Sequence, residues 1–314
     1  DMKVFQARNS NDMAVKVYEA LEDCGERSTS RNGPVLKFPG PVTTIYTNPW
    51  HRANFTPGRD ANPFFHIAEG MWMLAGRRDV EFLDYFNSQM KQYSDDGETF
   101  NAAYGYRARH QFGHDQLVEV AEMLNGHPTT RQAVIQLWDS LDLMANTKDK
   151  ACNMIMVFEI KGVELHLTVY NRSNDLIYGN VTGANPVHFS FFQQWVANKL
   201  DIPMGPLTFI STNAHVYTDN PIWQTMDFAA PINIRSLELP LGELDEIEEL
   251  CDLIMERKII RTEFDSMYLN LIAKPIFNTW IARKEKMGSD LIFSHMSICK
   301  CPALRLACNF WMEK

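Results

Sequence analysis

A cluster of polar side chains stands between two apolar stretches near the middle of the chain. Apolar and polar residues alternate from Val163 to Val169, as they do in a half-buried strand. The sequence then runs 171-NRSND-175 and becomes apolar again at Leu176. A loop that only faces water would not normally interrupt such a pattern. An arginine, a hydroxyl, amides and a carboxylate at a strand end instead indicate a site for a polar, anionic ligand.

Cys152 is the candidate nucleophile for that site. It begins a predicted strand, and a tight connection near Lys161-Gly162 leads into the strand that ends at Arg172 and Ser173. Antiparallel pairing of the two strands would bring the thiol close to the arginine and the serine. A nearby positive charge lowers the pKa of a thiol and activates it as a nucleophile. The alternative is a small buried apolar residue, which is the more common role of a cysteine.

Four further residues have side chains suited to a ligand or a proton. Arg131 follows a turn and precedes a predicted strand, so it could face a phosphate, although a single arginine is more often a surface residue. Glu69 is the only acid in the apolar segment 64–74, where a carboxylate suits proton transfer; the alternative is a glutamate on the helix surface. His215 and Tyr217 fall on one side of an extended segment and could hold a sugar hydroxyl, or be structural.

Composition limits the classes of protein and of ligand. The formal charge is -9, which argues against non-specific binding of nucleic acid, so any anion must be met by a local cluster of arginines. No apolar run approaches the ~20 residues of a membrane span, and residues 13–21 form an amphipathic pattern rather than a signal peptide. A methionine-rich chain with six cysteines is typical of a cytoplasmic protein with reduced thiols.

A metal site and a dinucleotide site are not expected. His295, Cys299, Cys301 and Cys308 lie in an apolar segment, at a spacing that structural zinc sites do not usually have. The sequence contains no P-loop, no G-x-G-x-x-G and no HExxH. The candidate chemistry is therefore expected to need no metal.

The elements that must position these residues are expected to form one α+β domain over residues 1–314, because no linker divides the chain. A helix is predicted from the capping residue Asn62 and Pro63 to Gly76, which suits a helix end. Residues 25–34 are expected to form a flexible loop, and Pro275 to interrupt a helix. The remaining predicted elements are strands at 35–38, 42–46, 133–138, 153–160, 163–170 and 207–211, and helices at 80–93, 116–124, 189–199, 243–258 and 263–283.

Seven short motifs occur in one order along the chain: 68-AEGMWMLAG-76, 104-YG-105, 129-TTR-131, Cys152, 171-NRSND-175, Asn185 and 215-HVY-217. Their types, order and approximate spacing resemble the thymidylate synthase and deoxycytidylate hydroxymethylase superfamily, over about residues 35–220. The resemblance implies a mixed β-sheet flanked by helices, with one face of the sheet forming the interface of a homodimer. The residues after 240 would form a helical C-terminal region.

The resemblance implies a one-carbon transfer from 5,10-methylenetetrahydrofolate to C5 of dUMP or dCMP. C5 of a pyrimidine is a poor nucleophile until a group adds at C6, and Cys152 would add there as a thiolate. Glu69, acting through water, would move protons at the base and at C5. Tyr104 and Asn153 complete the implied catalytic set.

The resemblance also assigns roles in binding. The implied contacts are to the nucleotide phosphate (Arg172, Ser173 and, from the neighbouring subunit, Arg131), the pterin of the folate (Asp175), the base edge (Asn185) and the 3′-hydroxyl (His215 and Tyr217). Arg52 and Arg59, in the loop before the helix that carries Glu69, are further phosphate candidates.

Departures from the family pattern indicate a divergent, phage-type member that makes a modified pyrimidine in the host cytoplasm. Asn153 stands where a histidine usually follows the cysteine, and Met90, with Tyr93 nearby, stands where the family has an active-site tryptophan. The C-terminal NFWMEK differs from the short apolar tail that closes over folate. Further departures are Asn171 for a glutamine, Gln132 for a second arginine, and two extra residues between Ser173 and Asn185. Several of these changes would loosen folate stacking or admit water, so hydroxymethyl transfer is expected, with reductive methylation as the alternative.

Two questions stay open at this point. Asn185 nominally favours dUMP, because a carboxamide can donate to O4 and accept from N3–H of uracil, but a flipped amide would fit dCMP. The class of protein also has alternatives: a cysteine hydrolase using Cys152 with His166 or His215, or a nucleotide-binding protein without activity. A hydrolase would need an oxyanion element that is not evident, and binding alone would require neither Cys152 nor Glu69.

Overall fold

The computed structural model describes residues 1–220, 222, 225–227 and 234–313, and within these ranges it contains two β-sheets. β1 pairs with β4 and β7 pairs with β9 in parallel, and the other neighbours in the larger sheet are antiparallel. This sheet is therefore mixed, as expected. Its spatial order is β1 (Lys3–Ala7), β4 (Val42–Tyr46), β9 (Met204–Ser211), β7 (Glu164–Asn171), β6 (Asn153–Lys161) and β5 (Val134–Gln136).

The smaller sheet includes a hairpin that the sequence pattern did not predict. Its order is β2 (Glu26–Ser30), β3 (Gly33–Lys37), β10 (Ala214–Tyr217) and β8 (Asn174–Asp175). The two residues Arg31 and Asn32 join β2 to β3, and Gly33 has a φ of 127°, a conformation that favours glycine. The expected flexible loop at 25–34 is therefore wrong. β2 is too polar to show an apolar alternation, and pairing with β3 holds it in place.

The predicted helices occur in the predicted order within the described residues, but some bounds differ, and the helices at Tyr104–Tyr106, Ser289–Ile298 and Pro302–Met312 were not predicted individually. The predicted helix 80–93 ends at Phe86, and a short 3₁₀ turn follows at Met90–Tyr93. Residues 267–284 form one helical run in which a π-helical turn at Leu269–Ala273 precedes α9, so the helix is interrupted next to Pro275 as predicted, although it begins at 267 and not at 263. The helices are α1 (Ser10–Cys24), α2 (Pro63–Leu74), α3 (Val80–Phe86), α4 (Tyr104–Tyr106), α5 (Gln116–Gly126), α6 (Asn185–Lys199), α8 (Leu244–Met255), α9 (Lys274–Lys284), α10 (Ser289–Ile298) and α11 (Pro302–Met312).

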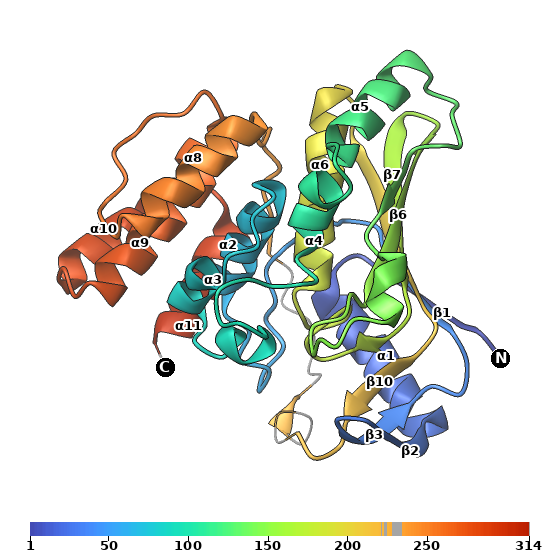
Figure 1. Cartoon of the computed structure of the whole chain (residues 1–314). Coiled ribbons are helices and arrows are strands. Elements are labelled where there is room, and N and C mark those ends of the chain that lie inside the picture. Colours follow the sequence, from blue (N-terminus) through green and yellow to red (C-terminus); the bar gives the residue numbers. More distant parts are fainter. Residues whose placement is uncertain (221, 223–224, 228–233, 314) are drawn as a thin grey trace.

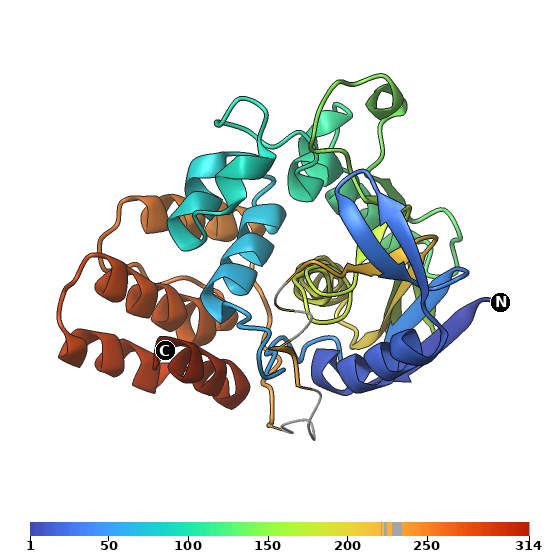
Figure 2. The ribbon, with the colours of Figure 1, turned by 90° about the horizontal axis from the view of Figure 1, so that it is seen from below.

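The C-terminal helices form a layer of their own, on the far side of α2 from the larger sheet (Figures 1 and 2). α8, α9 and α11 pack against α2, and α10 packs against α9. Phe86 of α3 stacks on Trp280 of α9, with ring centroids 5.2 Å apart. None of the helices in the described ranges has both the length and the apolar character needed to span a bilayer.

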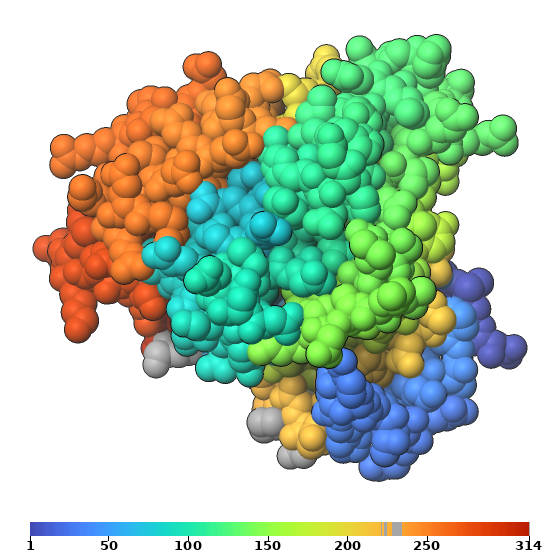
Figure 3. All heavy atoms as spheres, viewed as in Figure 1, coloured from blue at the N-terminus to red at the C-terminus, as the bar shows by residue number. Residues whose placement is uncertain are grey.

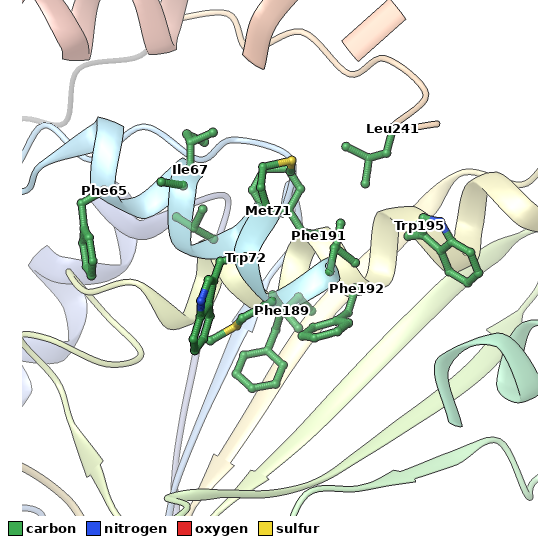
Figure 4. Close-up of a cluster of buried hydrophobic side chains, with 14 of the residues drawn as sticks. Phe65, Ile67, Met71, Trp72, Phe189, Phe191, Phe192, Trp195 and Leu241 are labelled. Atoms are coloured by element: carbon green, nitrogen blue, oxygen red, sulfur yellow. The ribbon is translucent and has the colours of Figure 1, made fainter. Parts of the chain in front are cut away.

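Helices α2 and α6 pack together in the centre of the molecule and carry a cluster of buried hydrophobic side chains, many of them aromatic (Figure 4). Gly70 permits the close approach, because a Cβ there would lie 2.3 Å from the ring of Phe191. Asn62 caps α2 by accepting a hydrogen bond from the backbone N–H of Phe65 at 3.2 Å. Every residue of α2 is buried, so Glu69 is held on a rigid helix inside the protein.

The opposite face of the larger sheet is open and partly apolar. The strand register places Val4, Thr43, Ile210, Tyr170 and Ile155 in one row across five strands, and residues in register share a face. Val4, Tyr170 and Ile155 are 57%, 38% and 36% exposed. The adjacent row points the other way, and its members Met156, Val169 and Phe209 are fully buried beneath the helices.

Candidate functional site

A cavity of about 540 Å³ is lined by the start of β6, the end of β7, β8, β10 and the β2–β3 hairpin. In the space-filling view the hairpin, in blue, lies directly below the light-green segment near residue 150 (Figure 3). Nine of the eleven predicted site residues line this cavity: Tyr104, Cys152, Asn153, Arg172, Ser173, Asp175, Asn185, His215 and Tyr217. The two others, Glu69 and Arg131, lie elsewhere.

Cys152 and Arg172 lie side by side, because β6 and β7 pair in the predicted antiparallel manner. The backbone N–H of Arg172 donates to the carbonyl of Cys152 at 3.0 Å, and Nη2 of Arg172 is 3.6 Å from Sγ of Cys152. The same guanidinium donates from Nε to the carbonyl of Ala151 at 2.8 Å. The thiol and the cation are thus held together by the sheet itself.

The pKa of Cys152 does not follow the prediction. Burial raises the pKa of this thiol above its ordinary value, and the positive charge of Arg172 opposes the rise without cancelling it. The expected depressed pKa is therefore wrong for this structure, because the sequence pattern could indicate the nearby arginine but not the desolvation of the sulfur.

Tyr104 holds the backbone at Cys152 and Asn153. Its hydroxyl oxygen accepts from the backbone N–H of Cys152 at 3.2 Å and of Asn153 at 3.4 Å. Burial raises the pKa of Tyr104 well above its ordinary value, so the phenol stays protonated. Because both hydrogen bonds use the oxygen as acceptor, the phenolic proton is left to donate towards the cavity.

Asp175, which is half-buried, and His215, which is buried, lie next to each other on the cavity wall. They are neighbours in the parallel pairing of β8 and β10, and the His215 ring meets Tyr217 edge to face with centroids 5.1 Å apart. Burial raises the pKa of Asp175 and lowers the pKa of His215. The carboxylate of Asp175 accepts from the backbone N–H of Ile177 at 2.8 Å, which orients it at the cavity wall.

The cavity contains cationic residues that the sequence pattern missed. Arg31 and Lys37 reach it from the β2–β3 hairpin, and Lys148 and Lys150 from the segment before Cys152. These side chains make part of the cavity positive in a protein whose net charge is -9. The dipeptide Asn32-Gly33 is a common hairpin signal and could have indicated that this segment is a structured wall.

Arg52 and Arg59 are not in the cavity, so their nomination as phosphate residues is wrong. Arg52 is 5% exposed and donates to the hydroxyl of Ser190 and to Gln194 of α6, both at 2.7 Å. Arg59 is 6% exposed and donates to the carbonyl of Ile177 at 3.1 Å. Both arginines stabilise the interior rather than meet a ligand.

Glu69 faces a second, smaller hollow of about 170 Å³ beside the cavity. The hollow and the cavity share Tyr104, Lys148 and Asp149, so they adjoin. The hollow has apolar walls from α2, α3 and the turns that follow: Trp72, Met73, Leu83, Met90, Phe100, Ala102 and Ala103, with Tyr93 at its edge. Met90 and Tyr93 thus lie in the hollow that contains Glu69.

His188 of α6 is a close neighbour of Glu69 that the sequence analysis did not single out. Its Nε2 lies 2.9 Å from a carboxylate oxygen of Glu69, at an angle outside that of a hydrogen bond. His188 is 3% exposed, and neither ring nitrogen forms a hydrogen bond with the described residues. His188 follows Asn185 by about one helical turn, so the two side chains lie on the same side of α6.

Arg131 is exposed and lies outside the cavity of its own chain, just before β5. The described residues contain no group of three or more side chains that could hold a metal ion. Cys299, Cys301 and Cys308 are buried without disulfides, and His295 is half-buried.

Comparison with known proteins gives one consistent result. The family model described as thymidylate synthase matches residues 59–270. Deoxyuridylate hydroxymethyltransferases of three phages are similar: that of Pseudomonas phage M6 is 43% identical over 73% of this chain and 66% of its own length, that of Bacillus phage SP01 39% over 70% and 61%, and that of Delftia phage PhiW-14 30% over 69% and 63%. The chain thus matches slightly less than two thirds of the length of these relatives. The crystal structure of thymidylate synthase from T4 phage has the same fold, with a TM-score of 0.58, 20% sequence identity, and coverage of 76% of this chain and 90% of that one.

Proposed function

Because this chain belongs to the thymidylate synthase family, we propose that it transfers a one-carbon unit to C5 of a pyrimidine deoxynucleoside monophosphate, with hydroxymethyl as the product. The observation that carries the proposal is the position of Cys152 in a partly cationic cavity, with Arg172 at 3.6 Å and the Glu69 hollow adjoining. A hydrolase would need donors arranged around an oxyanion, and a protein that only binds nucleotides would need neither the thiol nor the buried acid.

The cavity provides the groups that addition at C6 requires. The thiolate of Cys152 forms a bond to C6, the C5–C6 π electrons move onto C5 and O4, and C5 becomes nucleophilic. Arg172, Ser173 and cations such as Arg31 would hold the phosphate, and His215 with Tyr217 would meet the 3′-hydroxyl. The proton that Tyr104 keeps would stabilise negative charge that develops on the nucleotide near Cys152.

The lining of the adjoining hollow suits the flat ring of a folate, while the rest of the molecule would extend into the main cavity. Its walls are mostly apolar and include the rings of Trp72 and Phe100, and a flat pterin can stack on such walls. Asp175, on the wall of the main cavity, would accept hydrogen bonds from the pterin. When bound, 5,10-methylenetetrahydrofolate would supply the one-carbon unit at the oxidation level of formaldehyde.

Glu69 is proposed to manage the protons, with His188 positioned to share them. C5 would lose its proton while the bond between the new carbon and the folate nitrogen breaks, and a buried carboxylate beside an imidazole can take that proton. A nucleotide that carries a methylene group on C5 then gains either water, which gives hydroxymethyl, or hydride, which gives methyl. In the first case the water oxygen bonds to the methylene carbon and Glu69 takes a proton from that water. The Cys152 thiolate then leaves C6.

Hydroxymethyl transfer is favoured because the hollow contains Met90 where the family has a tryptophan, and Asn153 follows the nucleophile where the family has a histidine. A thioether stacks less firmly than an indole, and a carboxamide can hold a water molecule. The similar phage proteins are named deoxyuridylate hydroxymethyltransferases, which supports the same product and dUMP as the substrate.

Two measurements test the proposal. The protein, dUMP labelled with tritium at C5 and methylenetetrahydrofolate should release tritium to water, and no release with either dUMP or dCMP would remove the enzyme proposal. Mass spectrometry of the product should then show a gain of CH₂O, without formation of dihydrofolate. A gain of CH₂ with an equal amount of dihydrofolate would instead identify a methylating synthase.

We also propose a homodimer formed through the open face of the larger sheet. Val4, Tyr170 and Ile155 expose apolar side chains there in one row, and Val134 is 43% exposed on the edge strand of the same sheet. Arg131 is exposed and free of the cavity in its own chain, so it is available to reach the phosphate in a partner. A monomer with full activity in analytical ultracentrifugation would disprove this assembly. Since both substrates are cytoplasmic metabolites, the proposed location is the cytoplasm.

A further inference from the structure

A continuous row of carboxamides runs behind the cavity from Asn185 to Asn153. Asn185 donates from Nδ2 to Oδ1 of Asn180 at 3.0 Å, and Asn180 donates from Nδ2 to Oδ1 of Asn171 at 3.2 Å. Asn171 in turn donates from Nδ2 to Oδ1 of Asn153. Asn180 is fully buried, and Asn171 and Asn153 are each 1% exposed. These four side chains, called the amide row below, connect the residue expected to read the base with the residue that follows the nucleophile.

Ser211 and the backbone fix the middle of the amide row. The hydroxyl of Ser211 donates to Oδ1 of Asn171 at 3.0 Å and accepts from Nδ2 of Asn180 at 3.1 Å. The backbone N–H of Asn180 donates to Oδ1 of Asn174 at 3.1 Å, and its carbonyl accepts from the hydroxyl of Tyr46. These contacts hold Asn180 in one position. It therefore acts on a ligand only through Asn185, by presenting either Oδ1 or Nδ2 to that side chain.

The amide row can reverse its polarity only as a unit. If Asn185 alone turned its amide over, its Oδ1 would face the Oδ1 of Asn180, and two buried acceptors without a proton between them repel. Turning Asn180 as well moves the same conflict to Asn171, and then to Asn153. Reversal therefore requires all four amides and the Ser211 proton, and the polarity at one end of the row determines the polarity at the other.

Both ends of the amide row line the cavity, where polarity has chemical consequences. The row uses Nδ2 of Asn185 and Oδ1 of Asn153, which leaves Oδ1 of Asn185 and Nδ2 of Asn153 for a ligand. A cavity that receives a thiolate and a phosphate stabilises an N–H donor at Asn153 and disfavours an oxygen there. Charge near Cys152 thus favours the polarity in which Asn185 offers an acceptor to the base.

We propose that the amide row makes Asn180 a positioning residue for base selection, and that it selects a pyrimidine with a proton on N3. Uracil offers N3–H to Oδ1 of Asn185 and O4 to the remaining N–H of that amide. Cytosine has a bare N3 and an amino group, and would need the whole row reversed. The inference rests on the proposed function and narrows its nucleotide to dUMP.

The test compares kcat/KM for dUMP and for dCMP in the full chain and three variants, with methylenetetrahydrofolate present. Asn180→Ala removes the acceptor for Asn185, so the preference for dUMP should shrink about tenfold. Asn180→Asp presents an oxygen to Asn185 in either protonation state and should keep the preference. Asn278→Ala removes a comparably buried amide from α9 and, as the matched control, should also keep it. An unchanged preference in Asn180→Ala, or a lost preference in Asn180→Asp, would overturn the proposal.

Direct observation of the amide covers the case in which Asn180→Ala does not fold. Neutron diffraction from deuterium-exchanged crystals of the wild-type protein distinguishes Nδ2, which carries two deuterons, from Oδ1. Nδ2 of Asn185 turned towards Asn180 supports the proposal, and Oδ1 turned towards Asn180 overturns it. Failure of the proposed function would look different, because the wild-type protein would then convert neither dUMP nor dCMP, whatever the orientation of the amide.

Discussion

The cavity around Cys152 and the hollow around Glu69 adjoin at Tyr104, and they are lined by opposite kinds of side chain. The cavity around Cys152, of about 540 Å³, is lined mainly by polar and charged residues from strand ends and the β2–β3 hairpin. The hollow around Glu69, of about 170 Å³, has mostly apolar walls from α2, α3 and the turns after them. A charged nucleotide suits the first and a flat ring suits the second. If Cys152 and Glu69 act as proposed, the nucleophile and the proton-transfer group reach the reacting base from two differently built walls.

The largest expected effect comes from a substitution in the polar cavity. Cys152→Ala removes the nucleophile and should lower tritium release by at least ~10³-fold, because no other group can add at C6. Nucleotide binding, measured by calorimetry, should be largely retained, since the cations of the cavity remain. Cys24→Ala, at a half-buried cysteine outside the cavity, is the matched control and should be fully active. Substantial release by Cys152→Ala would assign the chemistry to another residue.

The second largest effect is expected from a substitution in the apolar hollow. Glu69→Gln keeps the volume of the side chain but cannot accept a proton, so kcat should fall by ~10²-fold or more. The KM for the nucleotide should change little, because Glu69 lies in the hollow and not in the cavity. Steady-state kinetics with varied nucleotide separates the two constants. A raised KM with an unchanged kcat would mean that Glu69 contributes to nucleotide binding and not to proton transfer.

A smaller effect would show whether Arg131 of one subunit contributes to the cavity of its partner. Arg131→Ala should cost about 1.5–3 kcal/mol in nucleotide binding, through loss of a charged hydrogen bond to the phosphate. If that contact crosses the interface, mixing Arg131→Ala with Cys152→Ala subunits should restore about a quarter of the wild-type activity, since half of the dimers then contain one complete site. Each variant alone should stay impaired. Normal nucleotide affinity in Arg131→Ala, or no recovery on mixing, contradicts the assignment.

The smallest expected effect is a shift in the pKa of the Cys152 thiol. Burial raises the pKa of the thiol and Arg172 partly opposes this, so the thiolate fraction is low near neutral pH and grows as the pH rises through the raised pKa. Alkylation of Cys152 by iodoacetamide, followed by mass spectrometry, should therefore have its midpoint above that of a free cysteine. Arg172→Gln should move the midpoint upward by about one unit.

Arg283→Gln is the control for the alkylation experiment, because Arg283 lies over Trp311 in the C-terminal layer. It should leave the alkylation midpoint of Cys152 unchanged. A midpoint below that of free cysteine in the unliganded protein, or one insensitive to Arg172→Gln, would show that Arg172 does not set the balance.

Much of the fold follows from local patterns. Asn62, Pro63 and Gly76 mark the ends of α2 because capping and turn conformations depend on a few neighbouring residues. The pairing of β6 and β7 was predictable because a tight turn at Gly162 joins the two strands directly and favours an antiparallel hairpin. The hairpin at β2 and β3 was missed because its first strand is polar, and only pairing with β10 through β3 holds it in the sheet.

The sequence by itself determined the types and order of the candidate reacting groups: a cysteine, a glutamate within an apolar segment, an arginine with a serine, and an asparagine at a helix start. These could be predicted because each motif is short and carries its own chemistry. Tertiary structure alone decided which cations line the cavity, with Arg31 present and Arg52 absent, and whether the pKa of Cys152 rises or falls. It also placed Asn180 within hydrogen-bonding distance of Asn185, a residue five positions later in the sequence. The physical reason is that desolvation, long-range charge and hydrogen-bond direction depend on all the atoms packed around a group, and residues distant in sequence supply most of those atoms.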